Sequence, residues 1–170
     1  MALAALDVAD HQVGAAKQRI ESLARSHPDH VQMLLALAGL ETDRQRLAAL
    51  YRRVLEASPK NLVVLNNLAY LLAGEDPDAA ISLAEEAIAL APNDPTVQDT
   101  VGWAYYQKGV YAVAVRYLEP AVSNAPTPQR QFHLGMAYLK LGQAGRGTAL
   151  IADALAKDSR LAGSNLGDVR

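Results

Sequence analysis

The chain has 170 residues, of which 51% are hydrophobic, and a net charge of −2. This composition excludes a disordered chain and favours one domain with a continuous core, while the small negative charge excludes a general attraction to nucleic acid or to an anionic membrane. Cysteine is absent, which excludes disulfides and thiolate metal sites, and no apolar run approaches the roughly 20 residues of a membrane-spanning helix.

Apolar residues recur at positions i, i+3, i+4 and i+7 along most of the chain, the spacing typical of amphipathic helices. No segment alternates with a period of two for long enough to predict a strand. We therefore expect an all-α protein, with helices in chain order over residues 13–26, 31–40, 47–57, 62–72, 80–91, 97–106, 112–122, 132–141 and 149–156.

Several helix ends have the side chains expected of them. Three helices should begin where a capping residue precedes a proline, at Asp76-Pro77, Asp94-Pro95 and Thr127-Pro128. Three turns should be made by glycines that follow the first helix of a pair, at Gly74, Gly109 and Gly142.

Two independent markers show that the chain repeats itself. The prolines at 28, 59, 92 and 126 follow one another after 31, 33 and 34 residues. The small residues Ala38, Ala69, Gly102 and Gly135 follow one another after 31, 33 and 33 residues. A shared period of this length predicts an array of two-helix units.

The repeated unit resembles the tetratricopeptide repeat (TPR), which is about 34 residues long. The best-matching unit has the family pattern at Val101-Gly102, Tyr105, Gly109, Ala114, Leu118, Ala121 and Pro126. Small residues at Gly102 and Ala114 should allow two antiparallel helices to approach closely, while Tyr105 and Leu118 fill the space toward the next unit.

The resemblance implies a right-handed superhelical solenoid of antiparallel helix pairs. It covers about residues 3 to 159, and we expect residues 1–170 to form a single solenoid segment with about four full repeats and a partial N-terminal one. The expected boundaries are 1–27 (partial), 28–60, 61–93, 94–127 and 128–159, with 160–170 as a tail or the start of a further repeat. We therefore expect the chain to be part of a longer array.

In the TPR family the first helix of each pair lines a concave groove. Transferred residue by residue, this resemblance implies a groove that includes Leu35 and Gly39 and a partner-binding set of Asn66, Asn67, Tyr70, Asp99, Trp103, Tyr106, Phe132, His133 and Met136. Trp103 has two interpretations, since it can line the groove or pack mainly in the core. We expect Tyr106 to reach solvent and act as an anchor, and Tyr105 to be a core residue.

Charge narrows the class of partner. TPR clamps for acidic C-termini need basic residues on the concave face, whereas the inward positions here include Asn66, Tyr70 and Asp99. Residues 62–126 contain two basic and eight acidic side chains, a balance of −6. An acidic peptide should therefore be repelled.

Other motifs offer little chemistry. The segment 142–148, GQAGRGT, has the glycine spacing of a phosphate loop but lacks the lysine and a preceding strand. The segment 27–30, HPDH, has no fourth ligand nearby. No nucleophile, base and acid occur at an interpretable spacing, so we expect no enzyme activity, no cofactor and no metal.

The sequence therefore predicts a non-enzymatic scaffold that binds a peptide or protein segment in its groove. The alternative is a structural spacer or assembly module with no peptide ligand of its own. Weak self-association through the ends is a further expectation, whereas nucleic acid and membrane insertion are not expected. The amino-acid sequence of residues 65–109 also resembles that of bacterial TPR proteins that accompany exosortase (PEP-CTERM) sorting and exopolysaccharide export. This resemblance implies a periplasmic or envelope location.

Overall fold

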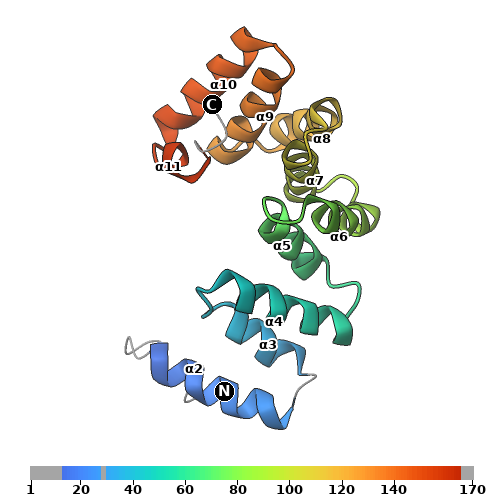
Figure 1. The fold of residues 1–170 in the computed structure, drawn as a ribbon, viewed down its shortest axis with the longest axis vertical. Coiled ribbons are helices and arrows are strands. Elements are labelled where there is room, and N and C mark those ends of the chain that lie inside the picture. The colour runs from blue at the N-terminus through green and yellow to red at the C-terminus, as the bar shows by residue number, and fades with distance from the viewer. Residues whose placement is uncertain (1–12, 28–29, 166–170) are drawn as a thin grey trace.

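The computed structural model describes residues 13–27 and 30–165, and this part of the chain is all α-helical, as the sequence predicts (Figure 1). The first twelve residues of the expected partial repeat, the marker Pro28 and the last five residues of the C-terminal tail lie outside the described residues. The helices are α2 (Val13–Ser26), α3 (Val31–Ala38), α4 (Arg44–Ala57), α5 (Leu62–Leu72), α6 (Pro77–Leu90), α7 (Pro95–Gln107), α8 (Tyr111–Asn124), α9 (Pro128–Lys140), α10 (Ala144–Lys157) and α11 (Leu161–Asn165).

The expected capping residues begin their helices. The side chains of Asp76, Asp94 and Thr127 each accept a hydrogen bond from a backbone N–H two or three residues further on, with a proline at the first helical position. Asp43 and Asn61 cap α4 and α5 in the same way. Apolar periodicity alone placed the starts of α4 and α10 several residues too late, because their first turns lack large apolar side chains, whereas the Asp76-Pro77 signal placed the start of α6 correctly.

Two of the three expected turn glycines adopt the left-handed conformation. Gly109 has φ 83° and Gly142 has φ 75°, and the backbone N–H of the following residue bonds a carbonyl five residues earlier in both turns. The turn at Gly74 is closed by hydrogen bonds from the N–H groups of Glu75 and Asp76 to the Leu72 carbonyl. All three turns reverse the chain so that the second helix packs against the first.

Small residues bring the paired helices together, as predicted. A Cβ atom added at Gly102 would lie 2.5 Å from Leu118 Cγ and 3.0 Å from the Ala114 carbonyl. In the next pair, a Cβ at Gly147 would lie 2.8 Å from the Gly135 carbonyl. Gly147, which departs from the alanine of the family pattern, therefore fits a closer approach between α9 and α10.

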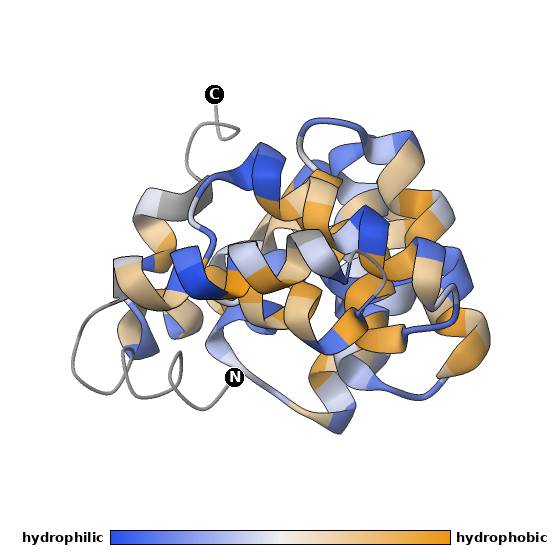
Figure 2. Ribbon diagram, turned by 90° about the horizontal axis from the view of Figure 1, so that it is seen from below, coloured by the Kyte–Doolittle hydropathy of each residue, from blue (hydrophilic) through white to orange (hydrophobic). Residues whose placement is uncertain are grey.

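The helix pairs stack in chain order into an arc (Figure 1). α6 lies on the outer side of α5, so the first helix of this pair faces the inside of the arc (Figure 1). Hydrophobic residues lie on the faces that the helices turn toward one another, whereas the connecting turns are largely hydrophilic (Figure 2). Within the described ranges, no helix has the length and apolar character needed to cross a membrane.

Candidate functional site

A cavity of about 700 Å³ opens on the inside of the arc, and we refer to it as the concave groove. Four helices and their ends supply its main side chains. Its wall includes Arg44, Leu47 and Tyr51 of α4, Asn66, Asn67 and Tyr70 of α5, Thr96, Asp99 and Thr100 of α7, and Gln129 and Arg130 of α9.

Four of the predicted partner-binding residues line this groove. Asn67 and Tyr70 are exposed, whereas Asn66 and Asp99 are almost fully buried and lie in the groove wall. The structure therefore brings together side chains from two successive repeats, as the periodicity predicts. Leu35 and Gly39, from the preceding pair, are not part of the groove wall.

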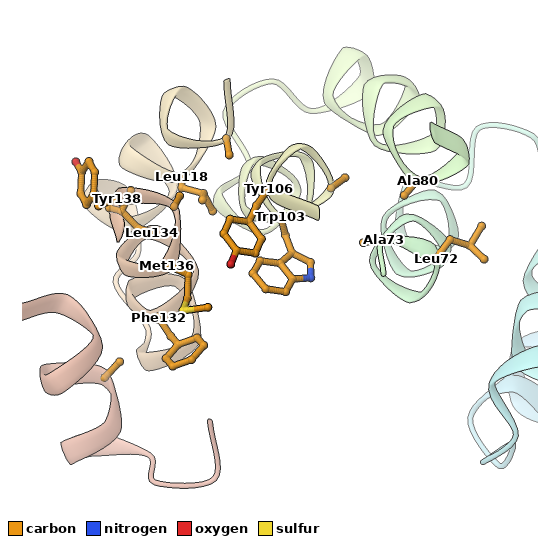
Figure 3. Close-up of a cluster of buried hydrophobic side chains, with 14 of the residues drawn as sticks. Leu72, Ala73, Ala80, Trp103, Tyr106, Leu118, Phe132, Leu134, Met136 and Tyr138 are labelled. Carbon is orange, nitrogen blue, oxygen red and sulfur yellow. The ribbon is translucent and has the colours of Figure 1, made fainter. Parts of the chain in front are cut away.

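The other five predicted residues are buried and do not line the groove. Trp103 is 4% exposed and Tyr106 is 3% exposed, so the expectation that Tyr106 reaches solvent is wrong. Phe132, Met136 and His133 are also buried. Figure 3 shows Trp103 and Tyr106 projecting from α7 beside Phe132 and Met136 of α9. Of the two interpretations of Trp103, its burial therefore favours the core position.

A layer of stacked rings supports the wall. The Trp103 ring stacks on Tyr106 at a centroid distance of 4.8 Å and on His133 at 4.2 Å. Tyr70 tilts against His133 at 6.1 Å. Aromatic stacking of this kind contributes about 0.5–1.5 kcal/mol per pair beyond the burial of surface. The groove wall is therefore built on a rigid layer contributed by α5, α7 and α9.

The sharpest polar feature is the contact between Asp99 and His133. His133 Nδ1 donates to the Asp99 carboxylate, at 3.0 Å from Oδ1 and 3.1 Å from Oδ2, and the histidine side chain is fully buried. This contact joins neighbouring repeats at the base of the groove. Because a carboxylate has about four lone-pair sites, the one donor leaves Asp99 able to accept further hydrogen bonds.

Asn66 adds a second acceptor to the same wall. Its side chain is 9% exposed, and Oδ1 is buried with no hydrogen-bond partner among the described residues. A buried polar atom without a partner costs about 1–3 kcal/mol. The wall of the groove thus contains a buried acceptor that the described residues leave unsatisfied.

Sequence reasoning missed two arginines and a glutamine in the groove. The Arg44 guanidinium bonds the Leu71 carbonyl at 2.6 Å and Glu75 at 3.3 Å. Arg130 bonds the Ala125 carbonyl at 2.7 Å and Thr96 Oγ1 at 2.9 Å. Helical spacing could have identified Gln129, which lies three residues before Phe132 on α9, but no local signal points to Arg44 on a second helix.

Gln129 closes one side of the groove. Its Nε2 donates to the Tyr70 hydroxyl at 2.8 Å, which links α5 to α9 across the intervening pair. Burial and the nearby charge of Asp99 raise the pKa of Tyr70, so this hydroxyl stays protonated at neutral pH.

A second cavity, of about 570 Å³, lies between α2, α3 and α4. Lys17 and Glu41 in its wall already form an ion pair at 2.8 Å. No group of three or more potential metal ligands occurs within residues 13–27 and 30–165. The concave groove is therefore the better candidate for a binding site.

Comparison with known proteins relates the chain to bacterial repeat proteins. It is 32% identical over 123 residues to a TPR repeat-containing protein of Pseudomonas aeruginosa, covering 69% of this chain and 21% of the relative. It is 29% identical over 162 residues to cellulose synthase 1 operon protein C of Komagataeibacter xylinus, covering 72% and 12%. The chain thus spans about a fifth or less of these relatives, and no family model matches it.

Solved structures share the fold at low sequence identity. MamA (residue 41 to the end) of Desulfovibrio magneticus RS-1 superposes with a TM-score of 0.77 at 16% identity, covering 91% of this chain and 90% of that one. PilW, a type IV pilus biogenesis factor, superposes with a TM-score of 0.75 at 19% identity, covering 91% and 74%.

Proposed function

Since this chain is a tetratricopeptide-repeat protein, we propose that it is a non-enzymatic scaffold whose concave groove binds an extended segment of a protein partner. Repeat arrays of this kind present long concave surfaces to their partners. The groove offers amide, hydroxyl and carboxylate groups rather than the converging nucleophile, base and acid of a catalytic site.

The observation that carries this proposal is the unsatisfied acceptor of Asn66 in a groove that also holds exposed Asn67 and Tyr70. Asparagine amides can bond both the N–H and the carbonyl groups of an extended main chain. A half-exposed tyrosine contributes a large contact area with a polar tip. The groove volume of about 700 Å³ can accommodate a few residues of such a segment.

Selection of peptides followed by competition tests this function. Random peptides displayed on phage would be selected on the 170-residue chain, and the enriched sequences synthesised and titrated. Asn67→Arg fills the groove with a long side chain and should weaken binding at least tenfold. Asn93→Arg, at an exposed position between α6 and α7, adds the same charge outside the groove and should leave affinity unchanged.

Equal affinity of the two arginine variants for every selected peptide would contradict the groove assignment. The groove assignment would also be contradicted if the selection yielded no peptide whose binding Asn67→Arg weakens. Either result would favour the second candidate function.

That second candidate is a structural spacer or assembly module, and an apolar surface supports it. A cavity of about 280 Å³ near the C-terminal end is lined by Phe132, Met136, Ile151 and Leu155, with Ala162 of α11 beside them. Apolar surfaces of this kind favour contact with another protein surface. Weak self-association in sedimentation experiments that Ile151→Ser abolishes would support the spacer function, and a strict monomer would count against it.

For the biological setting, we infer a bacterial envelope scaffold connected with polysaccharide export. The supporting observation is the similarity to two proteins named for cellulose synthase operons. The finer assignment to exosortase and PEP-CTERM systems rests only on the resemblance of residues 65–109 to such proteins. Fractionation of the native host, with the chain detected by antibody, tests the location, and recovery in the cytoplasm would contradict it.

A further inference from the structure

The base of the groove contains hydrogen-bond acceptors in excess of donors. Asn66 Oδ1 is buried and has no partner among the described residues. The Asp99 carboxylate lies in the same cavity wall and accepts hydrogen bonds only from His133 within the described part of the chain. Both residues occupy the same position in successive repeats, 33 residues apart, so they project from α5 and α7 into one space.

We infer that this pair forms a subsite for an arginine side chain of the partner segment, an inference that rests on the proposed function of the groove. A guanidinium group has five N–H donors in a planar arrangement, so one group can serve two acceptors at once. Asp99 supplies the opposite charge, and Asn66 Oδ1 supplies a neutral acceptor. The Tyr70 ring in the same wall offers the aromatic face on which guanidinium groups stack.

The basic groups of the groove do not occupy this subsite. Arg44 is directed to Glu75 and the Leu71 carbonyl. Arg130 is held by the Ala125 carbonyl and by Thr96 Oγ1. Neither forms an ion pair with Asp99, whose hydrogen-bond donor within the described residues is His133 Nδ1.

The wider field also favours a basic ligand. Residues 62–126, which include α5 to α8, carry two basic and eight acidic side chains. A surface with this balance attracts positively charged segments and increases their rate of association. Long-range attraction and the local acceptors therefore act in the same direction.

The subsite can be tested with a blocked tripeptide, Ac-Gly-Arg-Gly-NH2. Its control is the same peptide with citrulline, which has nearly the shape of arginine but no charge. Trp103 is the only tryptophan and stacks on His133, so NMR of its indole N–H reports on the ligand of Asp99 without a label. We expect a saturable shift with the arginine peptide and at least tenfold weaker binding of the citrulline peptide.

Three variants locate the effect. Asp99→Asn and Asn66→Ala should each weaken the binding of the arginine peptide at least fivefold. Glu86→Gln on α6 removes one negative charge at an exposed position away from the groove and should change the affinity less than twofold. Circular dichroism verifies that each variant is folded, and Asn66→Ala, which leaves every charge in place, decides the question should Asp99→Asn unfold.

Equal binding of the arginine and citrulline peptides, or no saturable shift with the parent protein, would overturn the subsite. If Glu86→Gln weakened the binding of the arginine peptide as much as Asp99→Asn does, general charge attraction would explain the binding. That result would also overturn the subsite. Some selected peptides could contain no arginine and still lose affinity in Asn67→Arg. Such peptides would overturn the subsite while leaving the proposed function intact. The two failures are therefore distinguishable.

Discussion

At the residue scale, Trp103 shows how a neighbour decides the role of a side chain. Its position on α7 points toward the inside of the arc, but His133 of the next repeat covers one face of the ring and Tyr106 covers the other. The ring therefore supports the groove from behind instead of contacting a ligand. The exposed aromatic side chain in the groove is Tyr70.

This difference in burial predicts opposite effects for two tyrosines. Tyr106→Ala removes a ring that is 3% exposed and should lower the free energy of unfolding by about 3 kcal/mol. Tyr70→Ala removes a ring that is 38% exposed and should cost about 1 kcal/mol or less while weakening groove-binding peptides. Urea denaturation and peptide titration of both variants measure the two effects. Equal destabilisation would show that the faces of these helices are misassigned.

The close approach of paired helices gives a second prediction at this scale. In Gly102→Ala the new Cβ would lie 2.5 Å from Leu118 Cγ, so the helices must move apart, at a cost of about 1–3 kcal/mol. Gly74→Ala, where no atom lies within 4 Å of the added Cβ, is the control and should be nearly neutral. Denaturation midpoints compare the two, and a stable Gly102→Ala would contradict the packing described for α7 and α8.

At the scale of helices, α2 is attached to the array by contacts of two kinds. Ala16, Ile20 and Ala24 pack against Met33 and Leu37 of α3. Lys17 reaches Glu41, beyond the end of α3, at 2.8 Å. The Glu41 carboxylate also accepts hydrogen bonds from the backbone N–H groups of Thr42 and Asp43, so it organises the turn before α4 as well.

The attachment of α2 should depend on pH in the acid range. The hydrogen bond from Lys17, followed by that from the Asp43 N–H, lowers the pKa of Glu41 from 4.5 to about 2. A depressed carboxyl pKa contributes stability that is present above pH 4.5 and is lost as the pH falls toward 2. Amide hydrogen exchange of α2 should therefore accelerate over this range, relative to that of α7.

Two lysine variants test the cause of that change. Lys17→Met should accelerate exchange in α2 at neutral pH and flatten its pH dependence. Lys157→Met breaks an exposed ion pair with Asp153 within α10 and should leave α2 unaffected. An unchanged pH profile in Lys17→Met would show that the ion pair does not hold α2.

At the scale of the whole molecule, one hydrogen bond spans the curvature of the array. Tyr70 and Gln129 are 59 residues apart in sequence, yet their side chains meet at 2.8 Å because the arc brings α5 and α9 together on its inner side. The Asp99–His133 contact lies at the base of the same space. The width of the groove is thus set by contacts between repeats.

Removing this bond should loosen the arc. The absence of cysteine allows spin labels to be placed at Glu86→Cys and Ala149→Cys, on α6 and α10. Gln129→Ala forfeits a bond worth about 1 kcal/mol and should broaden the distance distribution between the labels. Gln131→Ala, which breaks a contact with Asp153 inside the α9–α10 pair, is the control and should not. Identical distributions in both variants would show that Tyr70–Gln129 does not restrain the curvature.

The sequence by itself determined the helices and their pairing. These depend on local features, namely the 3.6-residue periodicity, caps such as Asp94, turn glycines such as Gly109, and the small residues that allow close pairing. Asn66, Asn67, Tyr70 and Asp99 could be placed in the groove because their positions repeat with the array.

Only the tertiary structure decided which inward residues stay accessible. The stacking of one repeat on the next buries Trp103 and Tyr106, and it brings Arg44 and Gln129 to the groove from distant parts of the chain. Burial of a side chain depends on the summed displacement of successive repeats, which no single repeat encodes.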